Sequence, residues 1–314
     1  EQEKAMLFNE LYTKGLTCEQ IGQISERVYS RIYSKQQISY LVQATQTDVN
    51  TWLVRDLASH YLVVYIDATF VPTRREHRVT QEAYYSILGV LPDGTREVLA
   101  IVNHPTEGAV NWQGELKALQ ERGVERIDLI VSDALAGIEN AVTSAFPASR
   151  HQFCVAHLLR EMSALVPRKD LRELHDEFRE VLSIDIDSED VNSASQYAAF
   201  LNFVERWSKR VSTFERYKKS RNALYFTLDY SPKYRRMLYT TNWIERLNRC
   251  YKRTLSMRGA MPSASSVLFL LGSVAMQMNK TTYSYPVSVF KDWNNDLSVH
   301  SSSFRAKESP TLEE

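Results

Sequence analysis

The spacing of apolar residues divides the chain into a helical beginning, a region of strands and a mostly helical remainder. Over residues 4–46, apolar side chains recur three or four positions apart, as on one face of a helix. Thr17-Cys18-Glu19-Gln20 and Ser34-Lys35-Gln36-Gln37 each match a capping box, in which side chains and backbone N–H groups bond reciprocally at a helix start. We therefore predict short helices that begin at these two boxes.

From residue 61 the pattern becomes that of strands. Apolar, β-branched and aromatic residues form short runs bounded by turn residues, including a Pro-Asp-Gly-Thr hairpin turn. We predict five strands, at residues 61–66, 82–91, 96–102, 127–131 and 150–155. Helices are predicted before and after the fourth strand, at about 107–122 and 135–146. This element order is that of the ribonuclease H-like fold, so we predict an α/β protein with a mixed five-stranded sheet and flanking helices.

The net charge of the 314 residues is zero, but the charges are unevenly distributed. Residues 205–258 contain 15 Lys or Arg and four acids, whereas residues 170–190 contain nine acids and two Arg. Aromatic residues are interleaved with the basic ones, a composition typical of surfaces that bind DNA phosphates and stack on bases. The alternative is a helical region whose rings pack in a core and whose charges face water. We expect most of these rings to be buried.

The cysteine content and the length of the apolar runs indicate in which cellular compartment the protein is expected. Cys18, Cys154 and Cys250 are too few and too scattered for a disulfide framework, which indicates a reducing compartment. No apolar run approaches the roughly 18 residues of a membrane span, and the longest, at 267–278, predicts a buried helix. We therefore expect a cytoplasmic protein with no membrane partner. The chain begins at Glu1 rather than at methionine, so we expect that an upstream segment precedes it.

The two capped helices near the N-terminus resemble a helix-turn-helix, whose second helix enters the major groove of DNA. The alternative is a plain helical hairpin, because the sequence signature of this motif is loose. The residues predicted to contact DNA are Lys35, Gln36, Gln37 and Tyr40, near the start of the second helix of the motif.

Three acids stand out by their positions. Asp67 and Asp133 follow the first and fourth predicted strands, which are neighbours in the predicted fold, and Glu245 lies on a later helix rich in Arg, Lys and Asn. Taken singly, either aspartate suits a helix cap or a turn, and Glu245 suits an ordinary Glu–Arg pair on a solvated helix. Together, three carboxylates suit Mg²⁺ or Mn²⁺. Two such ions would activate a water or a 3′-hydroxyl and stabilise the departing oxygen.

Several sequence blocks carry a family resemblance. The blocks are Ile66-Asp67-Ala68-Thr69-Phe70, Val131-Ser132-Asp133-Ala134 with Gly137-Ile138, Cys154-x-x-His157, Thr241-Asn242-x-Ile244-Glu245-x-Leu247-Asn248, Arg258-Gly259-Ala260 and Pro262-Ser263. In this order, over about residues 10–280, they resemble the transposases of bacterial insertion sequences related to the eukaryotic Mutator elements. The resemblance implies that Asp67, Asp133 and Glu245 are the catalytic acids and metal ligands. It also implies a homodimer. The chain departs from the family at Ala134, where bacterial members often have Gly, and we expect this change to be harmless.

Cys154 and His157 form a motif whose role the sequence leaves open. Cys-x-x-His is half of a zinc site, but no second pair lies at ligand spacing, which argues against structural zinc. In the resembling family the motif lies beside the acids, so we expect His157 to tune the catalytic site without binding the metal permanently. The alternative is a histidine satisfied in the core.

We predict a DNA transposase that binds the terminal inverted repeats of its element, cleaves double-stranded DNA and joins it to target DNA with two Mg²⁺ or Mn²⁺ ions per site. The rivals are another ribonuclease H-like nuclease that does not join strands, and a DNA-binding regulator derived from a transposase. The predicted DNA contacts after Glu245 are Asn242, Arg246, Asn248, Arg249, Lys252, Arg253 and Arg258.

The predicted domains combine the residue pattern with the resemblance. A helix-turn-helix DNA-binding domain covers residues 1–50. The ribonuclease H-like catalytic domain consists of residues 51–155 and 241–283. An all-helical insertion domain occupies residues 156–240, and a flexible C-terminal tail occupies residues 284–314.

Overall fold

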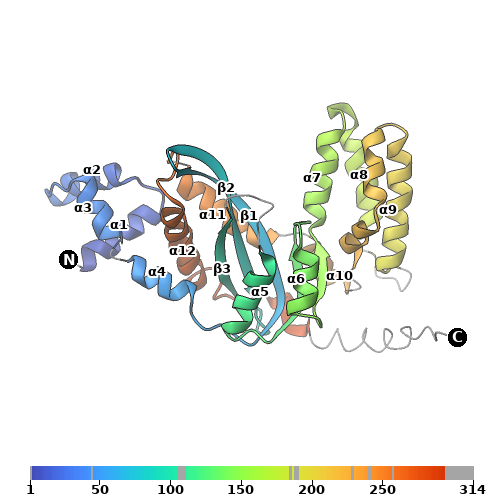
Figure 1. Cartoon of the computed structure of the whole chain (residues 1–314), viewed down its shortest axis with the longest axis horizontal. Helices are drawn as coiled ribbons and strands as arrows, with labels where there is room; N and C mark the ends of the chain where they lie inside the picture. The colour runs from blue at the N-terminus through green and yellow to red at the C-terminus, as the bar shows by residue number, and fades with distance from the viewer. Residues whose placement is uncertain are drawn as a thin grey trace.

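A computed structural model describes most of the chain and places a sheet between two groups of helices (Figure 1). The N-terminal helices lie at one end of the molecule, and the helices between residues 155 and 238 lie at the other end. The described residues are 2–43, 45–104, 111–183, 186, 191–227, 230–239, 242–256 and 258–293.

The sheet has five strands, as the sequence predicts, and is mixed. The strands are β1 (His60–Arg75), β2 (Arg78–Val90), β3 (Arg96–His104), β4 (Arg126–Ser132) and β5 (Arg150–Phe153). Their order across the sheet is β3-β2-β1-β4-β5. Strand β2 is antiparallel to both of its neighbours, β1 and β3, whereas β4 and β5 run parallel to β1. The central position of β1 brings it beside β4, although 50 residues of chain (76–125) separate the two strands.

Strand β1 is longer than the sequence analysis predicts. It does not end before Asp67 but continues to Arg75, paired with β2 as far as the Arg75–Arg78 pair. Thr69, Phe70 and Val71 are good strand formers, and each finds a partner on β2, so pairing continues. Asp67 is therefore an internal residue of β1, and the hairpin beyond it extends past the end of β3.

Helices cover both faces of the sheet. On one face α5 (Trp112–Glu121) and α6 (Ile138–Ala145) pack against Val64 and Ile66 of β1. On the other face α11 (Asn242–Leu255) and α12 (Ala264–Lys280) pack against Val63 and Tyr65. Alternate residues of β1 face opposite layers, because side chains along a strand alternate in direction. The apolar run at 267–278 lies in α12, and most of it is buried, as predicted.

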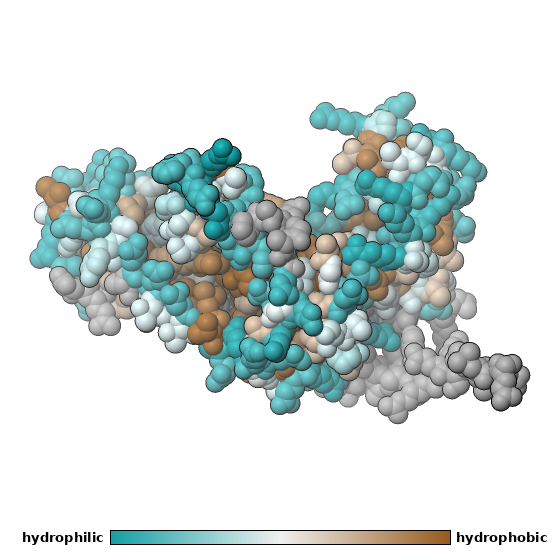
Figure 2. Space-filling model, in the orientation of Figure 1, coloured by the Kyte–Doolittle hydropathy of each residue, from teal (hydrophilic) through white to brown (hydrophobic). Residues whose placement is uncertain are grey.

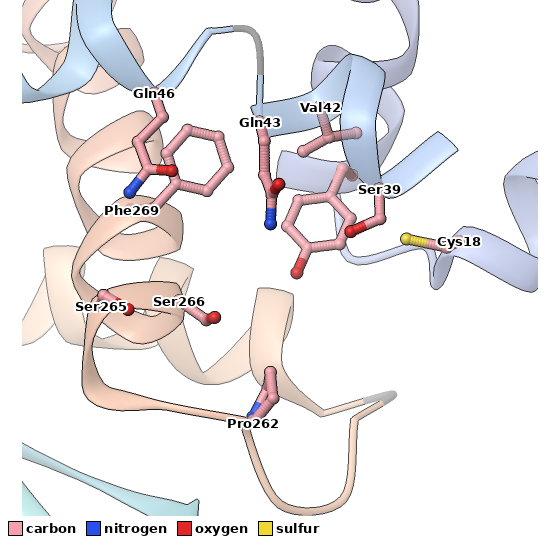
Figure 3. Close-up of a pocket in the computed structure, with 10 residues that line it drawn as sticks. Cys18, Ser39, Val42, Gln43, Gln46, Pro262, Ser265, Ser266 and Phe269 are labelled. Atoms are coloured by element: carbon pink, nitrogen blue, oxygen red, sulfur yellow. The ribbon is translucent and has the colours of Figure 1, made fainter. Parts of the chain in front are cut away.

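Four helices precede the sheet: α1 (Gln2–Thr13), α2 (Cys18–Tyr29), α3 (Lys35–Gln43) and α4 (Gln46–Leu53). Both predicted capping boxes are present, at Thr17 with Gln20 and at Ser34 with Gln37. A small core of apolar side chains holds the helices together, and Phe269 of α12 packs into it. Figure 3 shows side chains of α3, α4 and the start of α12 around a small polar cavity between these elements.

The described secondary structure between Val155 and Tyr239 consists of α-helices and short 3₁₀ helices. The α-helices are α7 (Val155–Leu165), α8 (Leu171–Leu182), α9 (Ser193–Ser208) and α10 (Pro232–Leu238). An aromatic cluster that includes Phe178, Phe200 and Phe203 forms the interior of this region. As expected, the rings interleaved with basic residues are mostly buried, among them Trp207, Phe214, Tyr225 and Tyr234.

The segment predicted to be a flexible tail from residue 284 packs on the fold as far as Trp293. A 3₁₀ helix forms at Ser288–Asp292, and Phe290 and Trp293 are buried against α10. The Trp293 indole N–H donates to Asp128 Oδ2 at 3.1 Å. The two aromatic rings anchor this segment, because burying each one removes a large apolar surface from water. Residues 294–314 of the predicted tail lie outside the described residues. No described helix is both long enough and apolar enough to span a membrane.

Candidate active site

The sheet register brings Asp67 and Asp133 to the same edge of the neighbouring strands β1 and β4. Ile66 pairs with Ser132 across these parallel strands, and each aspartate is the next residue along its chain. Asp67 is only 4% exposed, whereas Asp133 is partly exposed. The alternative role of Asp133 as a helix cap is not observed, because α6 begins at Ile138 after Gly137 and has no side-chain cap.

Helix α11 adds an amide and a third acid to this edge. Its apolar side chains Ile244, Leu247 and Tyr251 pack on the sheet, and Asn248 on the same side is 6% exposed. The Asn248 Nδ2 donates to Asp67 Oδ2 at 2.7 Å. The predicted DNA contact is therefore a residue that orients Asp67, because its buried amide donor is already used inside the protein.

Glu245 lies in the first turn of α11, about one turn before Asn248. Its negative charge contributes to the raised pKa of Asp67, which is consistent with a position near that carboxylate. Its carboxylate lies 3.5 Å from the guanidinium of Arg160 on α7. Both side chains of this pair are substantially exposed, so the pair contributes little to stability.

His157, in the first turn of α7, lies between the two aspartates. Its Nδ1 is 2.5 Å from Asp133 Oδ1, and its Nε2 is 3.9 Å from Asp67 Oδ1. The shorter contact lacks the alignment of a hydrogen bond, so we describe it as a close ionic contact. The structure places the imidazole at the acids and not in an apolar core.

Cys154 precedes α7 and is fully buried beside His157. Its sulfur and ligand atoms of Asp133 and His157 lie within 4.8 Å of one another. This group has three members, one fewer than the four protein ligands of a typical structural zinc site. The spacing of the Cys-x-x-His motif in the sequence gave no signal that Asp133 joins it.

The charges of the site shift its pKa values in opposite directions. Burial and the neighbouring charge of Asp133 raise the pKa of Asp67 to about 6, although His157 and the Ala68 N–H act against them. Burial alone would lower the pKa of His157, but its contacts with Asp133 and Cys154 outweigh burial and raise the pKa to about 10. Crowded carboxylates at low exposure form an environment that favours a bound cation.

The donor set fits a hard divalent cation. The carboxylate oxygens of Asp67 and Asp133 meet at one edge of the sheet, with Glu245 on the adjacent helix. Asn248 Oδ1 is buried and accepts no hydrogen bond from the described residues, so one more oxygen beside Asp67 is available as a ligand. Oxygen donors of this kind are the ligands that Mg²⁺ and Mn²⁺ prefer.

Further along α11 lies a set of exposed cations. Within the described part of the chain, none of them has a carboxylate within 4.0 Å. These predicted DNA contacts are Arg246, Arg249, Lys252 and Arg253. The side chain of Asn242, another predicted contact, lies outside the described residues.

Arg258 was expected to hold DNA with these cations, but its donors bond inside the protein. Its guanidinium donates to the backbone carbonyls of Thr254, Tyr12 and Leu16 and stacks 4.1 Å above the Tyr12 ring. The residue therefore ties the end of α11 to the N-terminal helices, because its hydrogen bonds are satisfied by these carbonyls.

The predicted DNA contacts of α3 are all exposed. Lys35 pairs with Glu19 at 2.7 Å, and the Gln37 side chain accepts from the Ser34 N–H in the capping box. Tyr40 is 75% exposed. A ring so accessible is available to a partner, whereas the Gln37 carbonyl is engaged in its own helix.

The basic charge of residues 205–221 is largely neutralised within the helical region. Arg206 pairs with Glu177, Arg210 with Glu173, and Lys218 with Glu205. The acidic stretch that the sequence places at 170–190 thus supplies counter-charges for the basic one. Figure 2 shows a mostly hydrophilic surface over these helices. The indole N–H of Trp207, which is 1% exposed, donates to Glu177, so this ring is not available to stack on DNA.

Comparisons with known proteins place these features in a family. The family model described as "Transposase, Mutator family" matches residues 2–284. A transposase of insertion sequence IS905 from Lactococcus lactis is 30% identical over 287 residues, which cover 90% of this chain and 67% of that protein. A transposase of IS1201 from Lactobacillus helveticus is 29% identical, over 85% of this chain and 70% of that protein. The IS256 transposase of Staphylococcus aureus is 26% identical, over 88% and 71%.

Among solved structures, the Drosophila P element transposase strand transfer complex aligns with 96% of this chain and 87% of its own chain. The identity is 12% and the TM-score is 0.31, a similarity too low to support an argument.

Proposed function

The chain belongs to the Mutator family of transposases, and we propose that it cleaves and joins DNA strands at a divalent-metal site formed by Asp67, Asp133 and Glu245. The observation that carries this proposal is the pairing of Ile66 with Ser132, which sets Asp67 and Asp133 at one edge of the sheet. The buried hydrogen bond from Asn248 holds the first of them in place from the helix that bears Glu245.

The reaction needs positioned groups more than covalent help from the protein. When bound, two Mg²⁺ or Mn²⁺ ions would activate a water or a 3′-hydroxyl and stabilise the departing oxygen. Asn248 and the Ala68 N–H, each donating to one oxygen of Asp67, fix that carboxylate for its role as a ligand. His157 carries a positive charge between the aspartates and reduces their repulsion.

The exposed cations of α11 are proposed to hold the DNA backbone beside the acids. Arg246, Arg249, Lys252 and Arg253 continue along the helix from Glu245 and lack nearby carboxylates among the described residues. Guanidinium and ammonium groups without counter-ions suit phosphates, whose binding releases condensed cations from DNA. The neutralised helical region contributes less to this binding than its composition suggests.

The finer architecture follows the same proposal. We assign a ribonuclease H-like domain to residues 51–155 and 241–283, extended to Trp293 by the packed segment that follows. Residues 156–240 form its helical insertion. The helices of residues 1–50 form a helix-turn-helix unit that binds the terminal inverted repeats through Lys35, Gln36 and Tyr40. We further propose a homodimer that pairs two DNA ends in the bacterial cytoplasm.

A strand-transfer assay tests the function. The substrate is a duplex ending in the terminal repeat with a free 3′-hydroxyl, incubated with target plasmid and Mg²⁺. We expect joined products with the wild type and at least a 100-fold loss with Asp67→Asn, Asp133→Asn or Glu245→Gln, since each removes a metal ligand. Binding of the same duplex, measured by gel shift, should persist in all three variants.

The outcomes separate the rivals. Cleavage of an unprocessed end without joining identifies a nuclease of the same fold. Binding without either reaction in any divalent metal identifies a regulator, and activity that survives all three substitutions refutes the assignment of the acids.

A further inference from the structure

A groove lies next to α11 on a different side from the acids. It has a volume of about 480 Å³ and is open to solvent. Its walls come from the start of β3, the first two turns of α11 and the segment after α12. They are formed by Arg96, Trp243, Arg246, Thr281, Thr282, Tyr285 and Pro286. Trp243 and Arg246 are three residues apart and share one face of the helix, whereas Glu245 projects from another.

The floor of the groove contains a buried cation that has no acidic partner among the described residues. Arg96 is 6% exposed, and no carboxylate of the described residues lies within 4.0 Å of it. Its Nη2 donates to the backbone carbonyls of Thr282 and Tyr285, both at 3.1 Å, while Nε and Nη1 have no hydrogen-bond partner in the described part of the chain. Buried arginines are normally paired with an acid, because an uncompensated charge is costly in a low-dielectric interior.

Aromatic rings surround this guanidinium. Its central carbon lies 4.6 Å from the Trp243 ring centre and 5.0 Å from that of Tyr283. The rings stabilise the cation through their negative faces but do not cancel its charge. The Trp243 indole N–H is also buried and has no acceptor among the residues that the structure describes. The floor of the groove therefore has the positive charge of Arg96 and an indole N–H, that of Trp243, which is unpaired within the described residues.

Arg246 at the rim adds a second positive charge. It is exposed, no carboxylate of the described residues pairs with it, and its charge acts to lower the pKa of Arg96. Two guanidinium groups that repel each other across one groove are both stabilised when an anion lies between them. Tyr285 at the same rim is 73% exposed and offers a flat ring beside the charges.

We propose that this groove binds a backbone phosphate of the DNA strand that runs along α11, with the adjacent nucleotide stacked on Tyr285. Arg246 contacts the phosphate directly. Arg96 lies beneath it and attracts the phosphate through its positive charge without touching it. DNA is favoured over other anions because the cations of α11 continue from the groove along the helix, so one strand reaches both. The inference rests on the proposed function and extends it to a second anchoring point outside the acids.

Fluorescence anisotropy with a labelled 30-base-pair duplex tests the inference, in EDTA and across a series of salt concentrations so that binding is measured without cleavage. Tyr285→Ala is the decisive variant, because its exposed, neutral side chain can be removed with little effect on folding. We expect it to weaken binding about fivefold with an unchanged salt slope, since stacking is lost and phosphate contacts are kept. Arg246→Ala should weaken binding and lower the slope of log K against log salt by about 1.

Two further variants complete the experiment. Arg96→Gln should weaken DNA binding, and its melting curve shows whether the variant is still folded. Lys117→Ala, which removes one exposed charge on the opposite face of the sheet, should bind DNA as the wild type does. Unchanged DNA binding by Tyr285→Ala overturns the groove assignment. The assignment is also overturned if Tyr285→Ala binds DNA normally but changes its oligomeric state in size-exclusion chromatography, because the groove would then be a contact between copies of the chain. Strand transfer by the wild type is scored separately, so the groove and the proposed function can fail independently.

Discussion

Replacing Asp67 by Asn should make the metal-free protein more stable while it removes metal binding. Asp67 is 4% exposed and lies near Asp133 and Glu245, so its ionised form is disfavoured in the folded chain. An uncharged amide of the same shape avoids this cost. The Ala68 N–H can still donate to its oxygen, and Asn248, whose Oδ1 has no partner, can reverse its amide to accept from the new NH₂ group.

The magnitude follows from the pKa. A rise of the pKa of Asp67 from 3.8 to about 6 sets an upper limit of roughly 3 kcal/mol on the cost of its charge at neutral pH. The attraction of the carboxylate to His157 is already included in this pKa, but a neutral amide accepts weaker hydrogen bonds than a carboxylate, so we expect a net gain of about 1–2 kcal/mol. For a chain of this size, that corresponds to an increase of roughly 1.5–3 °C in the melting temperature.

The pH dependence has a defined direction. Because the pKa of Asp67 is higher in the folded state, its charge destabilises the protein fully above about pH 6, and the cost disappears as the pH falls toward 4. The advantage of Asp67→Asn should therefore be complete at pH 7 and small at pH 4. Thermal melts in EDTA at both values measure it.

Addition of Mg²⁺ provides the opposing arm of the experiment. A Mg²⁺ concentration ten times the dissociation constant should stabilise the wild type by about 1.4 kcal/mol, because the folded wild type binds the ion. The stability of Asp67→Asn should not change. Asp48→Asn, at an exposed position on α4, is the control for removing one acid. The reasoning is refuted if Asp67→Asn melts below the wild type in EDTA, or if Mg²⁺ stabilises both proteins equally.

Three further substitutions test other contacts of the site. Asn248→Ala removes the donor to Asp67, so the Mg²⁺ concentration for half-maximal stabilisation should rise about tenfold in the same melts, and an unchanged midpoint would contradict the positioning role. His157→Ala should cost about 2–3 kcal/mol in denaturant titrations below pH 6.5. Because the pKa of His157 is raised to about 10, that loss should fade as the pH rises through 10, and a pH-independent loss would exclude a charged imidazole. Arg258→Ala should cost roughly 3 kcal/mol and expose the N-terminal helices to proteolysis, whereas the exposed Arg253→Ala should behave like the wild type.

The sheet was predictable because its signals are local. Runs of β-branched and aromatic residues with turn residues between them indicated all five strands, and the element order led to the neighbouring positions of β1 and β4. The end of β1 was missed, because its continuation depends on the partner strand and not on the residues of β1 alone. The capping boxes were predictable because each one is complete within four residues and does not depend on a distant partner.

The orientation of side chains on α11 was harder to predict. Asn248 follows Glu245 by three residues and Ile244 by four, so helical spacing alone allows it to face either the solvent or the sheet. Packing decides the matter: Ile244, Leu247 and Tyr251 are buried, and Asn248 lies on their side. The roles of Arg258 and of the paired charges in the helical region depend on contacts between distant segments, which spacing does not reveal.

The alignment of Ile66 with Ser132 restricts how β1 can change in length during evolution. One residue gained or lost between His60 and Asp67 would turn the carboxylate toward α5 and α6, because neighbouring side chains point to opposite layers. A change of two would restore the direction but displace the carboxylate by about 6.6 Å. Where the hairpin extends past β3, backbone hydrogen bonds between Met261 and residues Pro72 and Arg74 still hold it, and only the tip beyond Arg74 has no such constraint. Descendants of this chain can therefore remodel the hairpin tip freely, while residues 61–66 keep a fixed count.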